Sequence, residues 1–299
     1  WTWSGWVKRG ALSTRGVLMC GGSTNVNYIC FNDSGTTDYF GLTYGNTPSS
    51  LVNVMTTQVF RDPSAWYHLM VVYDSTSATS TITGSATDRV RLYVNGVQVT
   101  AFSATSGPSQ NTSVNINVAS AVLNIGRRNI ASPDSYFDGY LTEINFIDGQ
   151  ALTPSSFGQY NSLTGVWQPL KYTGTYGTNG FYLNFSDNSN NTATTIGKDY
   201  SGNGNNWTPN NISVTTGATY DSMLDVPTLF ADGGNGRGNY PVWNPLKKYT
   251  ANFAISNGNL TVTDTSASPV GLSATMRTPT SGKWYWEVTA TTISGILGY

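Results

Sequence analysis

The clearest alternation of hydrophobic and polar positions lies between residues 88 and 102. Val90, Leu92 and Val94 are separated by single residues of another kind, the period-two pattern of a strand with one buried face. Asn95-Gly96 follows, the dipeptide that best tolerates the two positive φ angles of a type I′ turn. The pattern therefore predicts a β-hairpin that turns at Asn95-Gly96.

The register of this hairpin follows from its turn. Folding at the turn pairs the apolar residues of the first strand with apolar or small residues of the second: Val94 with Val97, Leu92 with Val99, and Val90 with Ala101. A slip of one residue would turn Gln98 and Thr100 toward the core, so the buried face strongly specifies the register. We expect Val94 and Val97 to share that buried face.

The same patterns predict an all-β fold for the first half of the chain. Residues 66–74 are apolar at both alternating sets of positions, which is typical of a central strand covered on both faces. Thr153-Pro154 has the N-cap and first-turn residues of a single short helix. Further strand-like stretches lie at 1–7, 17–20, 28–31, 39–44, 51–60, 122–125 and 140–147. About ten short strands joined by turns predict an antiparallel β-sandwich over residues 1–158, whose core should include Leu69, Val71, Leu92, Val94, Val99 and Ile144.

Two further segments follow the sandwich. In residues 159–225, Phe181, Leu183 and Phe185 alternate with Tyr182 and Asn184, which predicts one more strand. Two interpretations of this segment stay open: an extended β segment that packs on the sandwich, or a linker. Residues 226–299 predict a second, partial β-sandwich, with a turn at Asn257-Gly258 and Leu260 and Val262 sharing one face. Its last predicted strand alternates Trp284, Trp286 and Val288 with Tyr285 and Glu287.

Composition limits the classes of function. The 299 residues carry a net charge of −1, and only 10% of them are charged. Such a chain lacks the basic footprint of a nucleic-acid-binding protein and the charged face of a membrane-binding helix. No apolar run approaches the roughly 20 residues that span a bilayer. Because the sequence starts at Trp1 and stops within the third segment, we expect the native chain to continue in both directions.

The cysteines allow two interpretations. Cys20 and Cys30 lie on either side of a glycine-rich turn, within reach of a cross-strand disulfide. We favour two half-buried free thiols, as in a protein assembled in a reducing cytoplasm. A tetrahedral structural zinc site is not expected, since two cysteines and one histidine supply too few ligands without carboxylates.

Several motifs resemble a known family. TWSGWVKR, FRDPSAWYHLMVVYD, RVRLYVNGVQV, LNIGRR and YFDGYLTEINFIDGQALTPSSFG occur in the order of a laminin-G-like domain of the concanavalin A-like jelly-roll group. The resemblance covers most of residues 1–158 and is closest to bacteriophage virion proteins, where segments like residues 165–213 follow. It implies binding of glycans or proteins, often with calcium. GKWYWEV, near the end, resembles the signature strand of SPRY domains, which are β-sandwiches used for binding.

The same jelly-roll fold hosts glucanases with an E-x-D-x-x-E strand, so catalysis is an alternative to binding. Glu143, Asn145 and Asp148 share that spacing, but the second and third positions depart from the pattern. Retaining hydrolysis needs two carboxylates about 5 Å apart, and the only other glutamate is Glu287. We read Glu143 as a solvent-facing residue and His68, the only histidine, as a hydrogen-bonded core residue. No catalytic residue is assigned, and the chain is not expected to be an enzyme.

Metal binding is the weaker of two interpretations for the loop DYSGNGNNW. Asp199, Asn203 and Asn205 offer hard oxygen ligands of the kind that calcium takes. A turn held by Asx hydrogen bonds explains the same residues, and we favour it. Asp74 and Asp88 form a second, weaker candidate pair. No cofactor is expected, with calcium the only candidate.

These observations lead to one functional hypothesis. We expect a bacteriophage virion protein, a tail fibre, spike or head-decorating component that adheres to host-surface polysaccharide. It would be assembled in the host cytoplasm and exposed on the particle. Sparse charge and the unguarded sheet edges expected in the third segment predict a homo-oligomer, a trimer by analogy with phage fibres, in contact with other virion proteins. The alternatives are a purely structural virion protein without glycan binding, and a glycan depolymerase whose active site lies outside this segment.

Overall fold

The structure is a computed structural model of the whole chain, and it divides into two compact units, Trp1–Ser222 and Met223–Tyr299. Each unit is described by itself. The described residues are 1–22, 26–32, 37–45, 52–78, 88–116, 118, 121–132, 134–162, 165–215, 220–228, 238–249, 252–264, 271–276 and 287–290.

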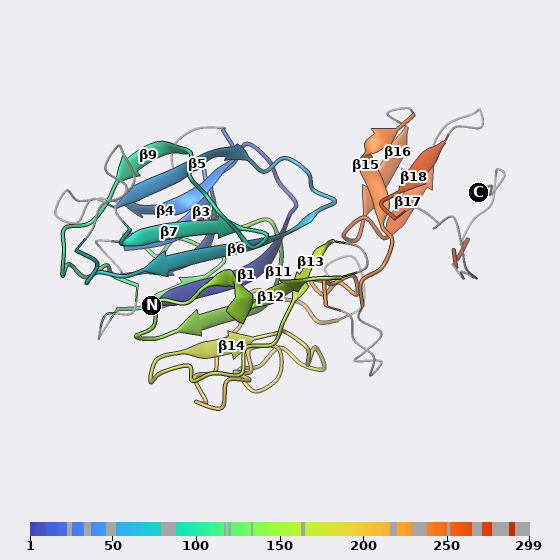
Figure 1. Cartoon of the computed structure of the whole chain (residues 1–299). Helices are drawn as coiled ribbons and strands as arrows, with labels where there is room; N and C mark the ends of the chain where they lie inside the picture. The colour runs from blue at the N-terminus through green and yellow to red at the C-terminus, as the bar shows by residue number, and fades with distance from the viewer. Residues whose placement is uncertain are drawn as a thin grey trace. The chain divides into compact units, whose positions relative to one another are not determined.

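Within the described part of the first unit, two six-stranded sheets face each other (Figure 1). Sheet 1 has the order β14 (Phe181–Leu183), β11 (Gly139–Ile147), β1 (Thr2–Arg9), β6 (Trp66–Tyr73), β7 (Val90–Val94) and β8 (Val97–Gln98). Sheet 2 has the order β10 (Leu123–Ile125), β2 (Gly16–Gly21), β3 (Val26–Phe31), β4 (Tyr39–Gly45), β5 (Asn53–Val59) and β9 (Phe102–Ser106). Every strand pair in both sheets is antiparallel. The all-β antiparallel sandwich is therefore confirmed.

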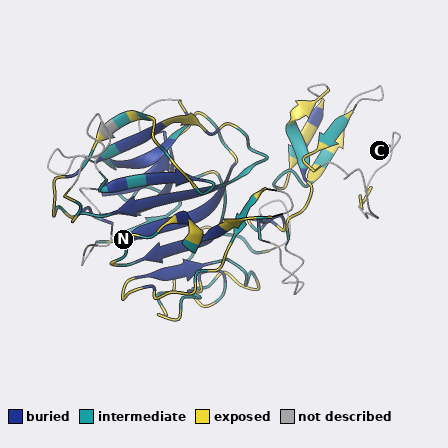
Figure 2. Cartoon of the chain, viewed as in Figure 1, coloured by how far each residue is buried: buried dark blue, intermediate teal, exposed yellow. Residues whose placement is uncertain are grey.

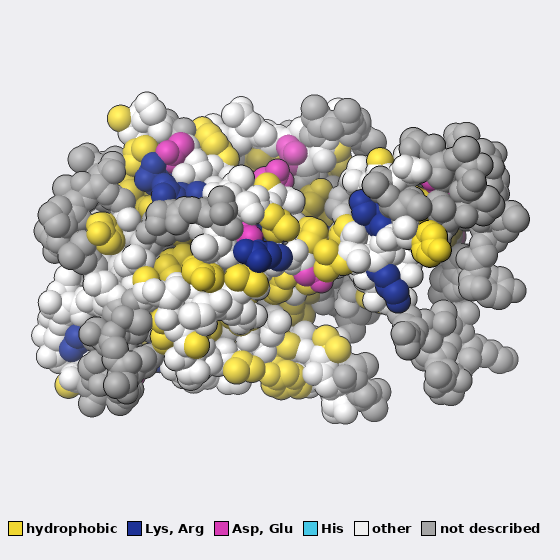
Figure 3. Space-filling view, turned by 90° about the horizontal axis from the view of Figure 1, so that it is seen from above, with side chains coloured by type: hydrophobic (Ala, Val, Ile, Leu, Met, Phe, Trp, Pro, Cys, Tyr) yellow, Lys and Arg dark blue, Asp and Glu magenta, His cyan; other side chains and the backbone are white. Residues whose placement is uncertain are grey.

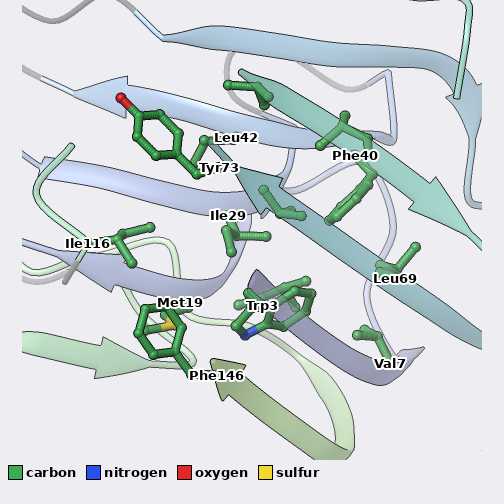
Figure 4. Packing of buried hydrophobic residues seen from close by; sticks show 14 of the residues in the cluster. Trp3, Val7, Met19, Ile29, Phe40, Leu42, Leu69, Tyr73, Ile116 and Phe146 are labelled. Atoms are coloured by element: carbon green, nitrogen blue, oxygen red, sulfur yellow. The ribbon is translucent and has the colours of Figure 1, made fainter. Parts of the chain in front are cut away.

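The main core lies between the two sheets, whose strands are largely buried (Figure 2). Side chains from both sheets pack together there, among them Trp3, Ile29 and Leu69 (Figure 4). Each sheet contributes large apolar side chains that are at most about one-hundredth exposed, among them Trp3 and Leu69 from sheet 1 and Ile29 and Phe40 from sheet 2. The predicted core residues Leu69, Val71, Leu92, Val94 and Ile144 are buried there, and Val99 packs against them half-buried.

The outer face of sheet 1 is also covered. Met70 and Val72 of β6 form a second buried cluster with Ile147 of β11 and with Tyr176 and Tyr182, which follow in the chain. The prediction that residues 66–74 form a central strand covered on both faces is confirmed, since β6 lies between β1 and β7. The cover is made largely by residues 152–200, which also supply β14 at the edge of sheet 1.

The predicted hairpin forms, but one of its residues is not where the pattern placed it. Asn95 and Gly96 have φ angles of 48° and 83°, as a type I′ turn requires, and Val94 pairs with Val97. The expectation that Val97 is buried is wrong, because its side chain is 61% exposed. β8 is a two-residue strand at the edge of sheet 1, so no further strand covers it.

The end of the hairpin departs from the predicted register because the chain leaves sheet 1 after β8. The Val99 N–H still donates to the Leu92 carbonyl at 2.9 Å. Beyond that point the chain leaves sheet 1, and β9 pairs with β5 in sheet 2. Ala101 is therefore exposed at the crossing and not paired with Val90. Alternation alone cannot show where a strand changes sheets.

Three smaller features complete the first unit. The single expected helix is the 3-10 turn η2 (Pro154–Ser156), and Thr153 precedes it without a side-chain capping bond. β12 (Gly158–Tyr160) and β13 (Trp167–Pro169) form a separate two-stranded ribbon. In the described part of the chain, no helix has the length and apolar character to cross a membrane.

The cysteines are free, as favoured from the sequence, but they are fully buried and not half-buried. β2 and β3 do form the expected hairpin. Its register pairs Cys20 with Tyr28 and Val17 with Cys30, so the two thiols are not opposite each other. Burial raises the pKa of the Cys20 thiol, which keeps this group protonated.

The second unit contains two small antiparallel pairs in its described residues. β15 (Trp243–Lys248) pairs with β18 (Leu272–Ala274), and β16 (Phe253–Ser256) pairs with β17 (Thr261–Asp264). The turn expected at Asn257-Gly258 is present, with positive φ at both residues. Trp284 and Trp286 lie outside the described residues, and Val288 is exposed and outside any strand.

Candidate functional site

The strand that carries the glucanase-like spacing has an irregularity at its centre. In β11, Thr142 pairs with Trp6 and Asn145 with Ser4, so three steps on β11 oppose two on β1. This is a β-bulge, and Glu143 lies in it with a φ of 52°, a value uncommon for a residue other than glycine. Bulges redirect side chains, and this one places Glu143 on the outer face of sheet 1.

Glu143 is buried beneath the covering segment. Its side chain is 7% exposed, and its Oε2 accepts a hydrogen bond of 2.5 Å from the Tyr182 hydroxyl. The expectation that Glu143 faces solvent is therefore wrong. The reason is tertiary: β14, which carries Tyr182, pairs with β11 and brings this tyrosine over the strand.

Tyrosine hydroxyls organise the surroundings of this carboxylate. Tyr176 donates to Asn145 Oδ1 at 2.9 Å, and the Asn145 amide donates to the Glu143 carbonyl at 2.9 Å. Burial first, and then the negative charge of Glu143, raise the pKa values of Tyr176 and Tyr182. Both hydroxyls are therefore protonated donors, and the network is built of satisfied polar groups.

Asp148, at the third position of the glucanase-like spacing, is hydrogen-bonded to the covering segment. Asp148 follows the end of β11, where its Oδ2 accepts from the Asn179 N–H at 3.1 Å and its own N–H donates to the Tyr176 carbonyl at 2.8 Å. The side chains of Glu143, Asn145 and Asp148 thus contact three different residues of the covering segment. The structure brings Glu143 and Asn145 together, but it ties them to tyrosines and not to an open cleft.

His68 is a buried, hydrogen-bonded residue on the same outer face, as predicted. The indole N–H of Trp167 donates to its Nδ1 at 3.0 Å, and its Nε2 lies 2.8 Å from Ser4 Oγ. Because indole is only a donor, Nδ1 is the acceptor and Nε2 carries the proton. Burial lowers the pKa of His68 to about 3, so the ring is neutral at physiological pH.

The loop proposed for calcium is held by hydrogen bonds within itself and to residues 177–182. The Asp199 carboxylate accepts from the N–H groups of Tyr182, Ser201 and Asn205 at 2.8–2.9 Å. The amide of Asn203 donates to the carbonyls of residues 177 and 180, and that of Asn205 donates to those of residues 178 and 180. The Ser201 N–H bond is that of an Asx turn, whereas the bonds to residues 177–182 tie the loop to the segment around β14. Calcium binding here stays a prediction.

Asp74 and Asp88 lie at the same end of β6 and β7, because the Asp74 N–H donates to the Arg89 carbonyl. The Thr76 hydroxyl donates to the Asp74 carboxylate at 2.7 Å and lowers its pKa. Among the described residues, no group of three or more histidine, cysteine or acidic side chains is placed to hold a metal ion.

The hydrophobic pattern of the sequence does not predict the ribbon formed by β12 and β13. Trp167 pairs with Tyr160 across this ribbon, with ring centroids 4.8 Å apart in an edge-to-face arrangement. The Tyr160 hydroxyl donates to the Asn95 carbonyl at 3.2 Å, so the ribbon lies on the turn of the central hairpin. Trp167 is half-buried and Tyr160 is 55% exposed. Trp167 and Tyr160 were the available signal, but their hydrogen-bond partners His68 and Asn95 are distant in sequence.

Comparison with known proteins supports the fold. The family model of the concanavalin A-like lectin/glucanases superfamily, in its laminin-G form, matches residues 1–157. A search of curated proteins finds no significant match. The match covers more than half of the chain and coincides with the strands of the two facing sheets, apart from β14. The chain belongs to the concanavalin A-like lectin/glucanases superfamily.

Proposed function

We propose that this chain is a non-enzymatic glycan-binding component of a bacteriophage virion. The observation that carries the non-enzymatic part is the covered outer face of sheet 1. Glu143 is the only glutamate in the glucanase-like strand, and it is buried against Tyr182. A general acid or nucleophile must reach the glycosidic bond, whereas this carboxylate lies under a layer of the chain itself.

Glycan binding is supported by the superfamily, whose description includes lectins. The surface is also compatible with neutral ligands. On the face seen in Figure 3, charged side chains are few and scattered among polar and hydrophobic ones, as the 10% charged composition requires. Sugars are recognised by uncharged hydrogen-bonding groups and apolar surface, so low charge suits this class of ligand.

The virion role rests on sequence resemblance. The motifs in residues 1–158 and the segment 165–213 resemble bacteriophage virion proteins in composition and order. In this proposal, the chain lies on the particle surface as a tail fibre, spike or head-decorating component, and it forms a closed homo-oligomer, a trimer by analogy with phage fibres. The sequence GKWYWEV near the end, which resembles the SPRY signature, supports a second binding module in residues 226–299.

The test uses the purified chain on immobilised and soluble host-surface polysaccharide. We expect saturable binding without release of reducing ends. Release of reducing ends that disappears in Glu143→Gln would establish a depolymerase instead. Stable particle incorporation without any glycan binding would establish a purely structural role.

A further inference from the structure

The ribbon of β12 and β13 presents an aromatic surface that the proposed function does not yet use. Tyr160 is 55% exposed and packs edge-to-face on Trp167, with ring centroids 4.8 Å apart. An exposed aromatic ring held against a second one offers a surface on which the apolar face of a ligand can stack.

The surface is rigid. The Trp167 ring lies against Gly96 and Gly158, where an added Cβ would come within 2.7 and 2.4 Å of indole atoms. The same indole donates to His68, and the Tyr160 hydroxyl donates to Asn95. Both aromatic rings are therefore tied to β6 and to the hairpin turn before any ligand arrives. A ring that is already fixed loses little conformational entropy on binding.

An uncharged amide follows the hairpin turn on which the ribbon lies. Gln98 is exposed, and it pairs with Tyr93, whose side chain belongs to the outer face of sheet 1, where Trp167 also lies. Neither residues 95–98 nor residues 158–170 contain a charged side chain.

We infer that this surface, the Tyr160 platform (Tyr160, Trp167 and Gln98), is the contact site for a neutral hexose polysaccharide. The apolar C–H face of a pyranose ring stacks on Tyr160, and the Gln98 amide bonds to its hydroxyl groups. The absence of charged side chains in the two segments fits a neutral sugar better than an acidic one. The inference rests on the proposed glycan-binding function and gives it a site outside the part of the chain that matches the family model.

The experiment measures binding of the full chain to arrays of neutral and uronic-acid-containing oligosaccharides. We expect the wild type to bind neutral glycans, Tyr160→Ala to lose about tenfold or more in affinity, and Tyr160→Phe to stay within about twofold. Tyr136→Ala is the matched control, since Tyr136 is 61% exposed but lies on the loop after β10. It should bind like the wild type.

Each other outcome has a defined meaning. Wild-type binding that Tyr160→Ala leaves unchanged overturns this inference and keeps the proposed function. Binding to acidic glycans alone also overturns the inference. If the wild type binds no glycan, the proposed function fails together with it. A lower oligomer mass for Tyr160→Ala in analytical ultracentrifugation, with glycan affinity unchanged, would assign the surface to a second copy and contradict the inference.

Discussion

The two faces of sheet 1 are stabilised in different ways. The inner face contributes almost only apolar side chains to the core between the sheets, such as Leu69 and Leu92. The outer face mixes apolar residues such as Met70 with the buried polar groups of His68 and Glu143. Those polar groups find their partners mainly on Trp167 and Tyr182, from the covering segment. The inner face is buried by sheet 2, which belongs to the residues that match the family model. The outer face is buried by the segment that follows them.

The largest effect is expected from removing that segment. A fragment ending at residue 158 lacks β14 and the cover over Met70, Val72 and Ile147. Each such side chain contributes about 1.5–3 kcal/mol by burial, so the loss is comparable with the 5–15 kcal/mol total stability of a typical domain. We expect this fragment to aggregate or bind a hydrophobic dye, and a fragment ending at residue 222 to unfold cooperatively in urea. Equal stability of the two fragments would show that the cover is dispensable.

Single core truncations compare the two faces directly. Leu92→Ala on the inner face and Met70→Ala on the outer face both remove fully buried side chains. Each should lower the free energy of unfolding by about 2–5 kcal/mol. Val97→Ala, at 61% exposure, is the control and should change it by less than about 0.5 kcal/mol. A small effect of Met70→Ala would mean that the outer face is loosely packed.

Lowering the pH should reduce the stability of the folded protein, because His68 is buried in its neutral form. The folded protein holds this ring neutral, with its pKa lowered to about 3 by burial, whereas the unfolded chain takes up a proton near pH 6.5. The unfolded state therefore binds more protons between these values, and stability falls as the pH drops from 6.5 toward 3. The expected slope is about 1.4 kcal/mol per pH unit. Urea titrations of the wild type and of His68→Asn at pH 7, 6, 5 and 4 measure it, and the variant should lack this part of the slope.

The smallest expected effect is the difference in stability between removing the Tyr182 hydroxyl and removing the Tyr176 hydroxyl. Tyr182→Phe removes a donor to a buried carboxylate and should cost about 1–3 kcal/mol. Tyr176→Phe removes a donor to the neutral Asn145 amide and should cost about 1 kcal/mol. Chemical denaturation at pH 7 ranks the two variants. The reverse order would show that the Glu143 carboxylate is satisfied mainly by other groups.

Local chemistry in the sequence predicted the central hairpin and the inner core. Asn95-Gly96 adopts positive φ because these two residues tolerate it best, and that preference acts within the turn itself. Leu69, Leu92 and Ile144 alternate with period two, so each could be assigned to a buried face before any partner strand was known. Burial of His68 followed from its apolar neighbours on β6.

Tertiary structure alone decided which alternating faces are covered. Alternation shows that a strand has two faces, but a covering segment or an edge position determines their exposure. Glu143 is buried because a bulge turns it toward Tyr182, 39 residues later in the chain. Val97 is exposed because β8 ends sheet 1 and the chain crosses to sheet 2 after it. The Tyr160 platform likewise depends on contacts with Asn95 and His68, which are distant in sequence and meet Tyr160 and Trp167 only in the folded protein.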